Sequence, residues 1–222
     1  MIKKADREPF MAALAAAHPD PKSELHWTTP YELLVAVVLS AQATDKGVNI
    51  ATAKLFPVAN TPEAIAALGV EGLTPYIQTI GLYRNKAKNV IKLSEILRDD
   101  YGGVVPEDFD QLVALPGVGR KTANVVLNVA FGHPTIAVDT HIFRVCNRTG
   151  FAKGTTPDAV EEKLYKVVPP AYLKNAHHWI LLHGRYCCKA RSPECERCPV
   201  AQWCNAPEKK KRLADLIPSS TE

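Results

Sequence analysis

The 222-residue chain contains no uncharged apolar run of 18 residues, which argues against a membrane-spanning helix. Its N-terminus has a short apolar patch but no uninterrupted signal-peptide core, since Asp6 and Glu8 interrupt it. Internal repeats and long linkers are missing as well. We therefore expect a soluble protein of the cytoplasm. With 46% apolar residues, it has enough material for one large folded domain or two small ones.

Strand patterns are nearly absent, whereas helix starts recur. Thr29-Pro30-Tyr31-Glu32 combines a capping box with proline at the first helical position, and Thr-Pro pairs begin again at Thr61 and Thr156. Apolar residues keep helical spacing from Arg84 to Tyr101. The single strand-like run, PTIAVD, is isolated and predicts an extended connection. The sequence predicts an all-α protein of roughly ten or more short helices.

Neither positive nor negative charge is strongly in excess. The net charge of +4 is weak support for a nucleic-acid partner. Basic residues do gather without acids between Leu82 and Leu93. The C-terminal third contributes a second group: Arg185, Lys189, Arg191, Arg197 and the run Lys209–Arg212. Solvated surfaces would explain each group equally well, so a phosphate-binding surface requires support from other signals.

A second CxxC pair is also missing, although five of the six cysteines lie between Cys187 and Cys204. The frame C-x6-C-x2-C-x5-C uses Cys188, Cys195, Cys198 and Cys204. Disulfides are disfavoured in a chain without a secretory signal. Four thiolates close in sequence cost little loop entropy to gather around one centre, which favours zinc or an iron–sulfur cluster. The spacing matches neither the usual zinc nor the usual ferredoxin pattern and does not decide between them.

Two cysteines fall outside this frame. Cys187 directly precedes Cys188, and adjacent residues cannot both point comfortably at one small cluster, so Cys187 is expected to stay a neighbour of the first ligand. Cys146 lies among apolar residues on an expected helix and is predicted to be a small buried hydrophobe.

A Pro-Gly-x-Gly turn within LPGVGRKTANVV predicts a helix–hairpin–helix whose second helix spans Lys121 to Phe131. Gly117 and Gly119 permit positive φ and close approach of a phosphate to backbone N–H groups. The helix N-terminus adds a dipole that attracts anions and repels an ammonium. Lys121 therefore either pairs with a phosphate or acts as a neutral amine.

A neutral amine at this position needs further help. A nucleophilic lysine requires a pKa of about 7–8 instead of about 10.4, a bias of about 4 kcal/mol. The helix dipole supplies about 0.3–1 kcal/mol, so burial or neighbouring cations must supply the rest. Asp139 could lie beside Lys121, because the helix from Lys121 to Phe131 rises about 15 Å and residues 132–138 can span roughly 25 Å. Asp139 is also a predicted N-cap, a role compatible with catalysis because both require an ionised carboxylate.

Four stretches occur in the order found in the endonuclease III family: VLSAQATD, TIGLYRNKA, the passage from LPGVGRK to NRTGFA, and HGRYCC with the cysteines after it. The chain resembles this family of helix–hairpin–helix DNA glycosylases from about Pro9 to Cys204. The family pairs a lysine and an aspartate eighteen residues apart, as Lys121 and Asp139 are here.

The resemblance implies two α-helical lobes with a DNA-binding cleft between them. A six-helix barrel with the helix–hairpin–helix would occupy residues 23–133. Residues 1–22 and 134–212 would form a discontinuous domain that holds a [4Fe–4S] cluster, and residues 213–222 are expected to be a disordered tail. The family's ligand pattern falls on Cys188, Cys195, Cys198 and Cys204, with the cluster in a structural role.

The resemblance also implies an activity: removal of oxidised pyrimidines from double-stranded DNA by a monomer, followed by strand cleavage at the abasic site. Lys121 would attack C1′ as a neutral amine and form a Schiff base, and Asp139 would assist before β-elimination of the 3′ phosphate. Gln42 and Leu82 match positions that fill the void left by the flipped lesion. His141 matches a pocket position, although an isolated helix histidine is commonly structural.

Further DNA contacts are implied at Gly117, Gly119 and Arg120 in the hairpin and at Lys189 and Arg191 in the cysteine-rich loop. That loop also departs from the pattern. Ser192 and Glu194 stand where more basic character is expected, which leaves open the residue that grips phosphate.

Two other functions are compatible with parts of the sequence. The adenine-excising branch of the same superfamily lacks the hairpin lysine, so Lys121 argues against it. A non-catalytic DNA-binding protein or cluster-based redox sensor would keep the hairpin and cysteines but would need neither Lys121 nor Asp139. The intact pair therefore favours the enzyme.

Overall fold

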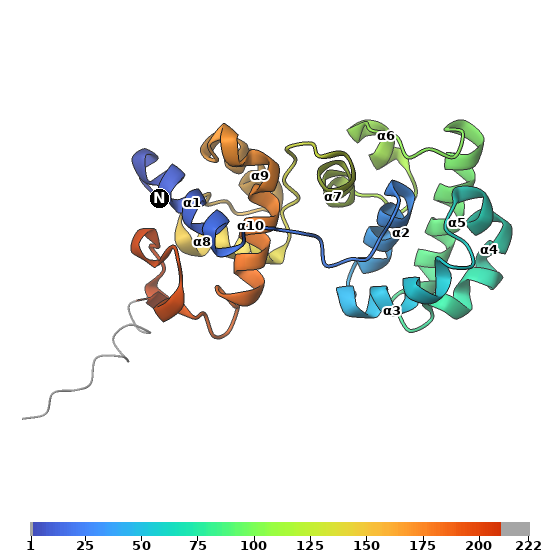
Figure 1. Ribbon diagram of the computed structural model, residues 1–222, viewed down its shortest axis with the longest axis horizontal. Helices are drawn as coiled ribbons and strands as arrows, with labels where there is room; N and C mark the ends of the chain where they lie inside the picture. The colour runs from blue at the N-terminus through green and yellow to red at the C-terminus, as the bar shows by residue number, and fades with distance from the viewer. Residues whose placement is uncertain (1, 210–222) are drawn as a thin grey trace, which may run out of the picture. The chain divides into compact units, whose positions relative to one another are not determined.

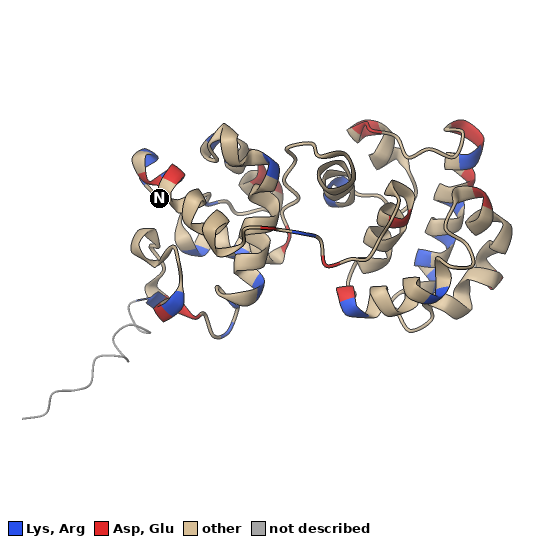
Figure 2. Cartoon of the chain, in the orientation of Figure 1, with Lys and Arg blue, Asp and Glu red and all other residues tan. Residues whose placement is uncertain are grey.

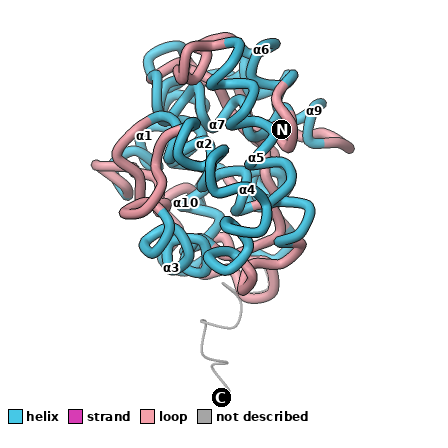
Figure 3. The backbone as a smooth tube through the Cα atoms, turned by 90° about the vertical axis from the view of Figure 1, so that its right-hand side faces the viewer, coloured by secondary structure: helices cyan, strands magenta, loops and turns pink. Residues whose placement is uncertain are grey.

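The protein is described by a computed structural model that covers residues 2–209. Within that range every regular element is a helix and no strand occurs, as Figure 3 shows, so the all-α prediction is confirmed. Residues 134–139, the PTIAVD segment, form the predicted extended connection. The segment 213–222, predicted to be a disordered tail, and most of the basic run at Lys209–Arg212 lie outside the described residues. None of the described helices is both long and apolar enough to cross a bilayer.

The chain divides into two compact units, each with its own hydrophobic core. One unit is Ser23–His133, and the other joins the segment ending at Lys22 to the segment that begins at Pro134. Figure 1 shows the helices of both units. The Ser23–His133 unit contains α2 (Pro30–Ser40), α3 (Asp45–Leu55), α4 (Pro62–Ile77), α5 (Tyr83–Asp100), α6 (Phe109–Ala114) and α7 (Arg120–Phe131).

Helix α2 is the centre of the Ser23–His133 unit. It packs against α3, α5 and α7, and every residue from Tyr31 to Leu39 is buried. Such an apolar, uniformly buried helix is stabilised by burial of about 1.5–3 kcal/mol per large side chain. Helix α5 packs along α4, and its buried face carries Val90 and Leu97. This core fixes the loops at the ends of α2 and α5.

The three Thr-Pro pairs start helices as predicted. The hydroxyls of Thr29, Thr61 and Thr156 each accept a hydrogen bond from the backbone N–H three residues on. At Thr29 the Glu32 carboxylate accepts hydrogen bonds from the Thr28 N–H and hydroxyl, both at 2.6 Å, in addition to a backbone hydrogen bond from Thr29. Burial raises the pKa of Glu32, but hydrogen bonds led by that of the Thr28 hydroxyl outweigh it and lower the pKa overall.

Among its described residues the second unit contains these helices: η1 (Lys4–Asp6), α1 (Arg7–Ala17), α8 (Thr140–Thr149), α9 (Pro157–Val167), η2 (Pro170–Tyr172), α10 (Leu173–Tyr186), η3 (Cys195–Arg197) and η4 (Ala201–Trp203). Helix α10 packs against α1 and α8. Phe10 stacks on Phe151 with ring centroids 4.6 Å apart, which ties the N-terminal helix to the rest of the unit.

A glycine lets α8 and α10 approach closely. A Cβ on Gly184 would lie 2.9 Å from the Cβ of His141 on the facing helix, closer than side chains tolerate. The close approach matters because Asp139 is the N-cap of α8 and the cysteine-rich segment follows directly after α10.

Candidate functional site

The predicted hairpin joins α6 to α7 over residues 115–119. Gly117 has φ +79°, the left-handed region that favours glycine. Gly119 has φ −92°, an ordinary extended conformation, and serves as the N-cap of α7. No heavy atom lies within 4 Å of a Cβ built on Gly119, so the space in front of the helix N-terminus is open. Such a terminus attracts anions.

We expect Gly117→Ala to destabilise the protein by about 1–3 kcal/mol, because the left-handed conformation strains alanine and its Cβ would lie 2.9 Å from the Cβ of Asn89. Gly119→Ala is the matched control and should cost about 1 kcal/mol or less, since only a modest capping preference is lost. Urea unfolding of both variants measures the difference. Equal losses of stability in the two variants would show that the left-handed conformation at Gly117 is not what holds the hairpin in place.

Lys121 is the second residue of α7, and its side chain is exposed. Its ammonium or amine group can therefore be reached from solvent. Its neighbour Arg120 lies against the protein, with the guanidinium carbon 5.2 Å from the centroid of the Phe109 ring. Lys121 is thus presented to solvent at the end of a helix where negative charge is favoured.

Asp139 is the N-cap of α8, as predicted. Its Oδ1 accepts hydrogen bonds from the backbone N–H groups of His141 at 2.9 Å and Ile142 at 2.8 Å. The carboxylate is half-buried, and both capping bonds use Oδ1, which holds the group in one orientation and leaves Oδ2 outside the cap.

His141 follows in the first turn of α8, and its Nδ1 accepts a hydrogen bond of 3.2 Å from the Arg144 guanidinium. A ring nitrogen that accepts from arginine is unprotonated, so the proton of the neutral ring is on Nε2. Burial, assisted by Arg144 and Arg185, lowers the pKa of His141 despite the nearby Asp139. His141 is therefore a neutral hydrogen-bonding group beside that carboxylate.

Gln42 and Leu82 share an unusual backbone. Within the described residues they are the two non-glycine positions with positive φ, at 54° and 60°. Both are exposed, Leu82 to 58%. Their loops are neighbours, because the carbonyl oxygen of Gln42 lies 3.7 Å from where a Cβ on Gly81 would stand. Strained, exposed residues of this kind cluster at functional sites.

A buried lysine fixes these loops. The Lys86 ammonium donates to the carbonyl oxygen of Leu39 at 2.9 Å and so ties α5 to the end of α2. Burial lowers the pKa of Lys86. Three exposed basic residues lie on α5 after Leu82 and are spaced one turn apart: Arg84, Lys88 and Lys92. Figure 2 shows basic residues on α5 in blue. The sequence indicated this basic segment without separating the buried lysine from the exposed ones.

The four cysteines of the predicted frame lie in the short segment that follows α10. Burial and then the thiols of Cys198, Cys204 and Cys188 raise the pKa of Cys195. Cys146, by contrast, is fully buried on α8, as predicted, and burial raises its pKa.

Polar groups of the protein point at three of these sulfurs. The Arg148 guanidinium donates to Cys188 Sγ at 3.7 Å, and the Ala206 N–H donates to Cys204 Sγ at 3.4 Å. His183 Nε2 lies 3.7 Å from Cys198 Sγ. Donors of this kind stabilise ligating thiolates and tune the metal group. The residues therefore fit a four-thiolate cluster.

Cys187 lies differently from the sequence expectation. Its Sγ, the Cys198 Sγ and a ring nitrogen of His183 all lie within 4.8 Å of one another. Cys188 is also near, because the amides of Cys187 and Cys188 both bond to the carbonyl of His183 in a tight turn after α10. This turn brings neighbouring thiols toward the same centre. A hydrogen bond from Cys187 lowers the pKa of Cys198, and His183 reinforces the effect.

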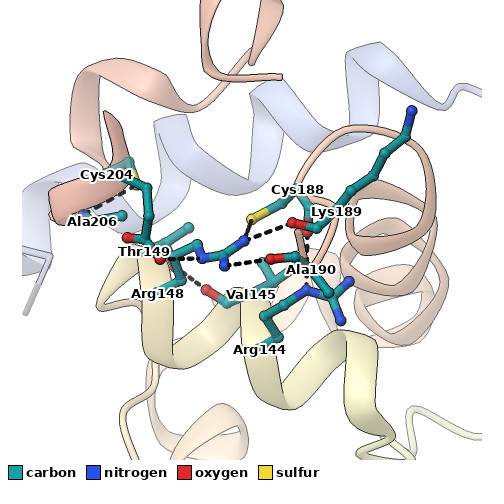
Figure 4. Close-up of polar contacts among 10 residues, drawn as sticks. Arg144, Val145, Arg148, Thr149, Cys188, Lys189, Ala190, Cys204 and Ala206 are labelled. Carbon is teal, nitrogen blue, oxygen red and sulfur yellow. Dashed lines mark hydrogen bonds and ion pairs between the residues drawn. The ribbon is translucent and has the colours of Figure 1, made fainter. Parts of the chain in front are cut away.

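Two arginines that the sequence reading missed hold the cysteine-rich loop, as Figure 4 shows. Arg148 donates to the carbonyl oxygens of Lys189 at 2.8 Å and Ala190 at 3.1 Å. It also forms an ion pair of 3.1 Å with Glu208. Its guanidinium therefore connects the loop to the C-terminal segment.

Arg144 lies one turn before Arg148 on α8 and holds the beginning of the same loop. It donates to the carbonyl oxygens of Cys188 at 3.0 Å and Gly184 at 2.8 Å. The i, i+4 spacing places both arginines on one face of α8. That spacing is visible in the sequence, but the carbonyl partners are not.

Glu194 stands where a basic residue was expected, and it binds two basic residues of its own loop. Lys189 Nζ lies 2.5 Å from its Oε1, and the Arg197 guanidinium bonds to its other oxygen. The side-chain hydrogen bond from Lys189 and then that from Arg197 lower the pKa of Glu194. Lys189 is thus paired within the loop, whereas Arg191 is exposed.

Comparisons with known proteins agree with this geometry. A family model for the HhH-GPD superfamily of base excision DNA repair proteins matches residues 35–170, and the iron-sulfur binding domain of endonuclease III matches residues 188–204. The chain is 59% identical to endonuclease III of Escherichia coli (strain K12) over 94% of this chain and 99% of that one. It is 57% identical to endonuclease III of Treponema pallidum (strain Nichols) over 86% of this chain and 90% of the relative.

Solved structures agree as well. A trapped endonuclease III–DNA covalent intermediate, in an estranged-adenine complex, matches with a TM-score of 0.89 and 48% identity, covering 96% of this chain and all of that one. A non-covalent endonuclease III–DNA complex matches with the same TM-score and 47% identity over the same shares. Fold, hairpin and thiol cluster thus define a base excision DNA repair protein of the HhH-GPD superfamily.

Within that superfamily, the chain belongs to the endonuclease III family. It is a DNA-binding enzyme, a DNA glycosylase and abasic-site lyase, and its cofactor is a [4Fe–4S] cluster. The choice between zinc and an iron–sulfur cluster, which spacing left open, is thereby made.

Proposed function

We propose that the enzyme removes oxidised pyrimidines from double-stranded DNA and cleaves the strand 3′ to the resulting abasic site. The observation that carries this proposal is Lys121 at the exposed N-terminus of α7 in a chain that also presents the capped carboxylate of Asp139. The non-catalytic alternatives need neither residue.

Lys121 acts in this proposal as the nucleophile. Its neutral amine attacks C1′ of the damaged nucleotide, and the bond from C1′ to the base breaks, so that the base leaves and takes up a proton. The C1′–O4′ bond then opens, a proton passes from the amine to O4′, and the product is a Schiff base. Abstraction of a proton from the sugar then allows β-elimination of the 3′ phosphate. Because Lys121 is exposed, bound DNA must desolvate the amine, while the dipole of α7 disfavours the ammonium throughout.

Asp139 assists this chemistry. Its Oδ1 is occupied by capping bonds and its Oδ2 lies outside the cap, so it can stabilise positive charge on the sugar or accept a proton from the lysine. His141, neutral and held by Arg144, serves the pocket for the extruded base through its Nε2–H. The lesion must leave the helical stack before either group can reach it.

Gln42 and Leu82 fill the space that the extruded base leaves. Their strained, exposed and adjacent loops support this role, since a side chain entering a base stack must project from a firmly held backbone. The hairpin groups Gly117, Gly119 and Arg120 contact the DNA backbone, as do Lys189 and Arg191 in the cysteine-rich loop. Support comes from the open space at Gly119 and the exposure of Arg191.

The two units take different tasks in this proposal. Ser23–His133, with six α-helices, is the barrel lobe that carries the hairpin. The other unit is the cluster domain, in which Cys188, Cys195, Cys198 and Cys204 ligate the [4Fe–4S] cluster. When bound, the cluster supplies a rigid cross-link for the loop and no base chemistry. We further propose that the enzyme acts as a monomer in the cytoplasm, since its substrate is chromosomal DNA.

An excision assay tests the lesion class. Duplexes bearing one thymine glycol or one methylated adenine are incubated with cluster-loaded enzyme, and strand cleavage is followed directly and after alkali. We expect the oxidised pyrimidine to be excised on the order of 100-fold faster or more. Leu82→Ala should slow excision from duplex DNA but leave cleavage of a single-stranded abasic site nearly unchanged. Preference for the methylated purine would contradict the proposal.

A further inference from the structure

The cysteine-rich segment holds one thiol more than a cluster needs. Of the five cysteines between residues 187 and 204, the family frame leaves out Cys187. The structure nevertheless places Cys187 beside one of the predicted ligands: its Sγ lies within 4.8 Å of Cys198 Sγ and donates to the carbonyl oxygen of Glu194 at 3.7 Å. Cys187 is buried and Cys198 is partly exposed.

Contacts within the protein keep these two residues together. The Glu194 N–H donates to the carbonyl oxygen of Cys187 at 3.0 Å, and the Arg197 guanidinium donates to the carbonyl oxygen of Tyr186 at 3.1 Å. Both bonds join the end of α10 to the residues just before Cys198. Arg148 holds the intervening loop through the carbonyl oxygens described above. None of these bonds uses a metal ligand atom, so they persist when the cluster is absent.

We propose that Cys187 and Cys198 form a disulfide once oxidation has removed the cluster. The proposal rests on the assignment of Cys198 as a cluster ligand. A peroxide oxidises the partly exposed Cys198 thiol to a sulfenic acid and releases one water. The Cys187 sulfur then attacks the Cys198 sulfur, the S–OH bond breaks, and the hydroxyl leaves as a second water with the Cys187 proton. Two thiols are oxidised, and one peroxide is reduced.

Geometry favours this pair over its competitors. A disulfide needs sulfurs about 2.05 Å apart, and side-chain rotation can close a separation of less than 4.8 Å. Among the described residues, the group whose ligand atoms all lie within 4.8 Å of one another contains Cys187 and Cys198 but not Cys188, Cys195 or Cys204. Cys187 is not one of the four assigned ligands, so a disulfide between Cys187 and Cys198 removes only one ligating thiol from the cluster site.

The disulfide has a defined consequence. It withdraws Cys198 from the ligand set and stops a partly oxidised loop from collecting a new cluster. It also protects Cys198 from the irreversible sulfinic and sulfonic acids, because a disulfide is reducible and those acids are not. The Cys187–Cys198 pair thus makes oxidative loss of the cofactor reversible by thiols.

The experiment uses the full-length, cluster-loaded protein and hydrogen peroxide, with iron removed by a chelator as the cluster decays. Absorbance near 410 nm follows the cluster, a thiol reagent counts free cysteines, and peptide mapping with fragmentation assigns the bond. We expect wild type to lose two of its six thiols into a Cys187–Cys198 bridge. Ferrous iron and sulfide should then restore the absorbance only after a thiol reductant is added.

Two variants sharpen the test. Cys187→Ser should form no such bridge and should accumulate Cys198 sulfinic or sulfonic acid, so that reductant rescues at least about tenfold less cluster than in wild type. Cys146→Ser, which changes a buried cysteine on α8, should behave like wild type. Mapping on wild type decides the matter even if Cys187→Ser loads poorly. A bridge from Cys198 to Cys188, Cys195 or Cys204, or no bridge, would overturn the proposal.

The outcome is separable from the proposed enzymatic function, since none of these readouts involves DNA. A Cys187–Cys198 bridge that forms while the 410 nm absorbance stays intact would refute the ligand assignment of Cys198 and, with it, the proposal. Loss of glycosylase activity with a normal bridge would leave the thiol chemistry standing.

Discussion

Lys121→Gln is expected to lower the rate of strand cleavage at an abasic site by on the order of 10³-fold or more, while affinity for the same duplex falls less than about fivefold. Glutamine keeps the length and polarity of the side chain at the start of α7 but cannot form a Schiff base. Single-turnover cleavage and equilibrium binding, both with cluster-loaded protein, measure the two effects.

Lys88→Gln is the matched control, because Lys88 is an exposed lysine of α5 with no proposed chemical role. It should leave cleavage nearly unchanged and at most weaken binding, as expected for one phosphate contact. The phosphate-clamp interpretation of Lys121 makes the opposite prediction. In that case Lys121→Gln would weaken binding, reduce the slope of log K against log salt by about one, and impair cleavage only in parallel.

Asp139→Asn is expected to reduce cleavage by about 10²–10⁴-fold and to change the free energy of unfolding by less than about 0.5 kcal/mol. Asparagine caps a helix as well as aspartate does, so the bonds from the His141 and Ile142 N–H groups to the side-chain oxygen survive. The negative charge and the proton-accepting oxygen are lost. Unfolding by urea and single-turnover cleavage separate the two roles.

Asp139→Ala extends this comparison, because it removes the cap along with the charge. It should lose about 1 kcal/mol of stability in addition to the activity. Full activity in Asp139→Asn would show that Asp139 is a helix cap alone, and the catalytic pair would reduce to Lys121.

Local signals predicted much of the fold. A threonine followed by proline marks the start of a helix, because the threonine oxygen caps the first turn and proline has a helical φ angle. The helix starts at Thr29, Thr61 and Thr156 could therefore be predicted without tertiary information. The N-cap at Asp139 was legible for the same reason. The four-cysteine frame was visible from its short spacing, although its cofactor needed the family comparison.

Contacts distant in sequence were not predictable. Arg148 bonds to a carbonyl 41 residues away, and a backbone carbonyl carries no signature of its partner. Lys86 was grouped with exposed lysines because composition does not distinguish a buried ammonium that serves a helix end. The left-handed backbone at Gln42 and Leu82 was equally hidden, since neither residue type favours positive φ.

Two local details could not be read from the sequence. The sequence permitted positive φ at Gly119, but as an N-cap this residue takes the extended conformation usual before a helix. Cys187 and Cys188 were not expected to point at one small cluster, yet Cys187 Sγ lies within 4.8 Å of Cys198 Sγ. Short-range geometry of this kind depends on how the preceding helix ends.

Borohydride trapping tests the central claim most directly. Cluster-loaded protein is incubated with a duplex bearing one abasic site, borohydride is added, and the linked peptide is identified. We predict one covalent protein–DNA adduct, attached at Lys121 and absent from Lys121→Gln. No adduct from active, cluster-loaded protein, or an adduct attached at another amine, would contradict the assignment of Lys121 as the nucleophile.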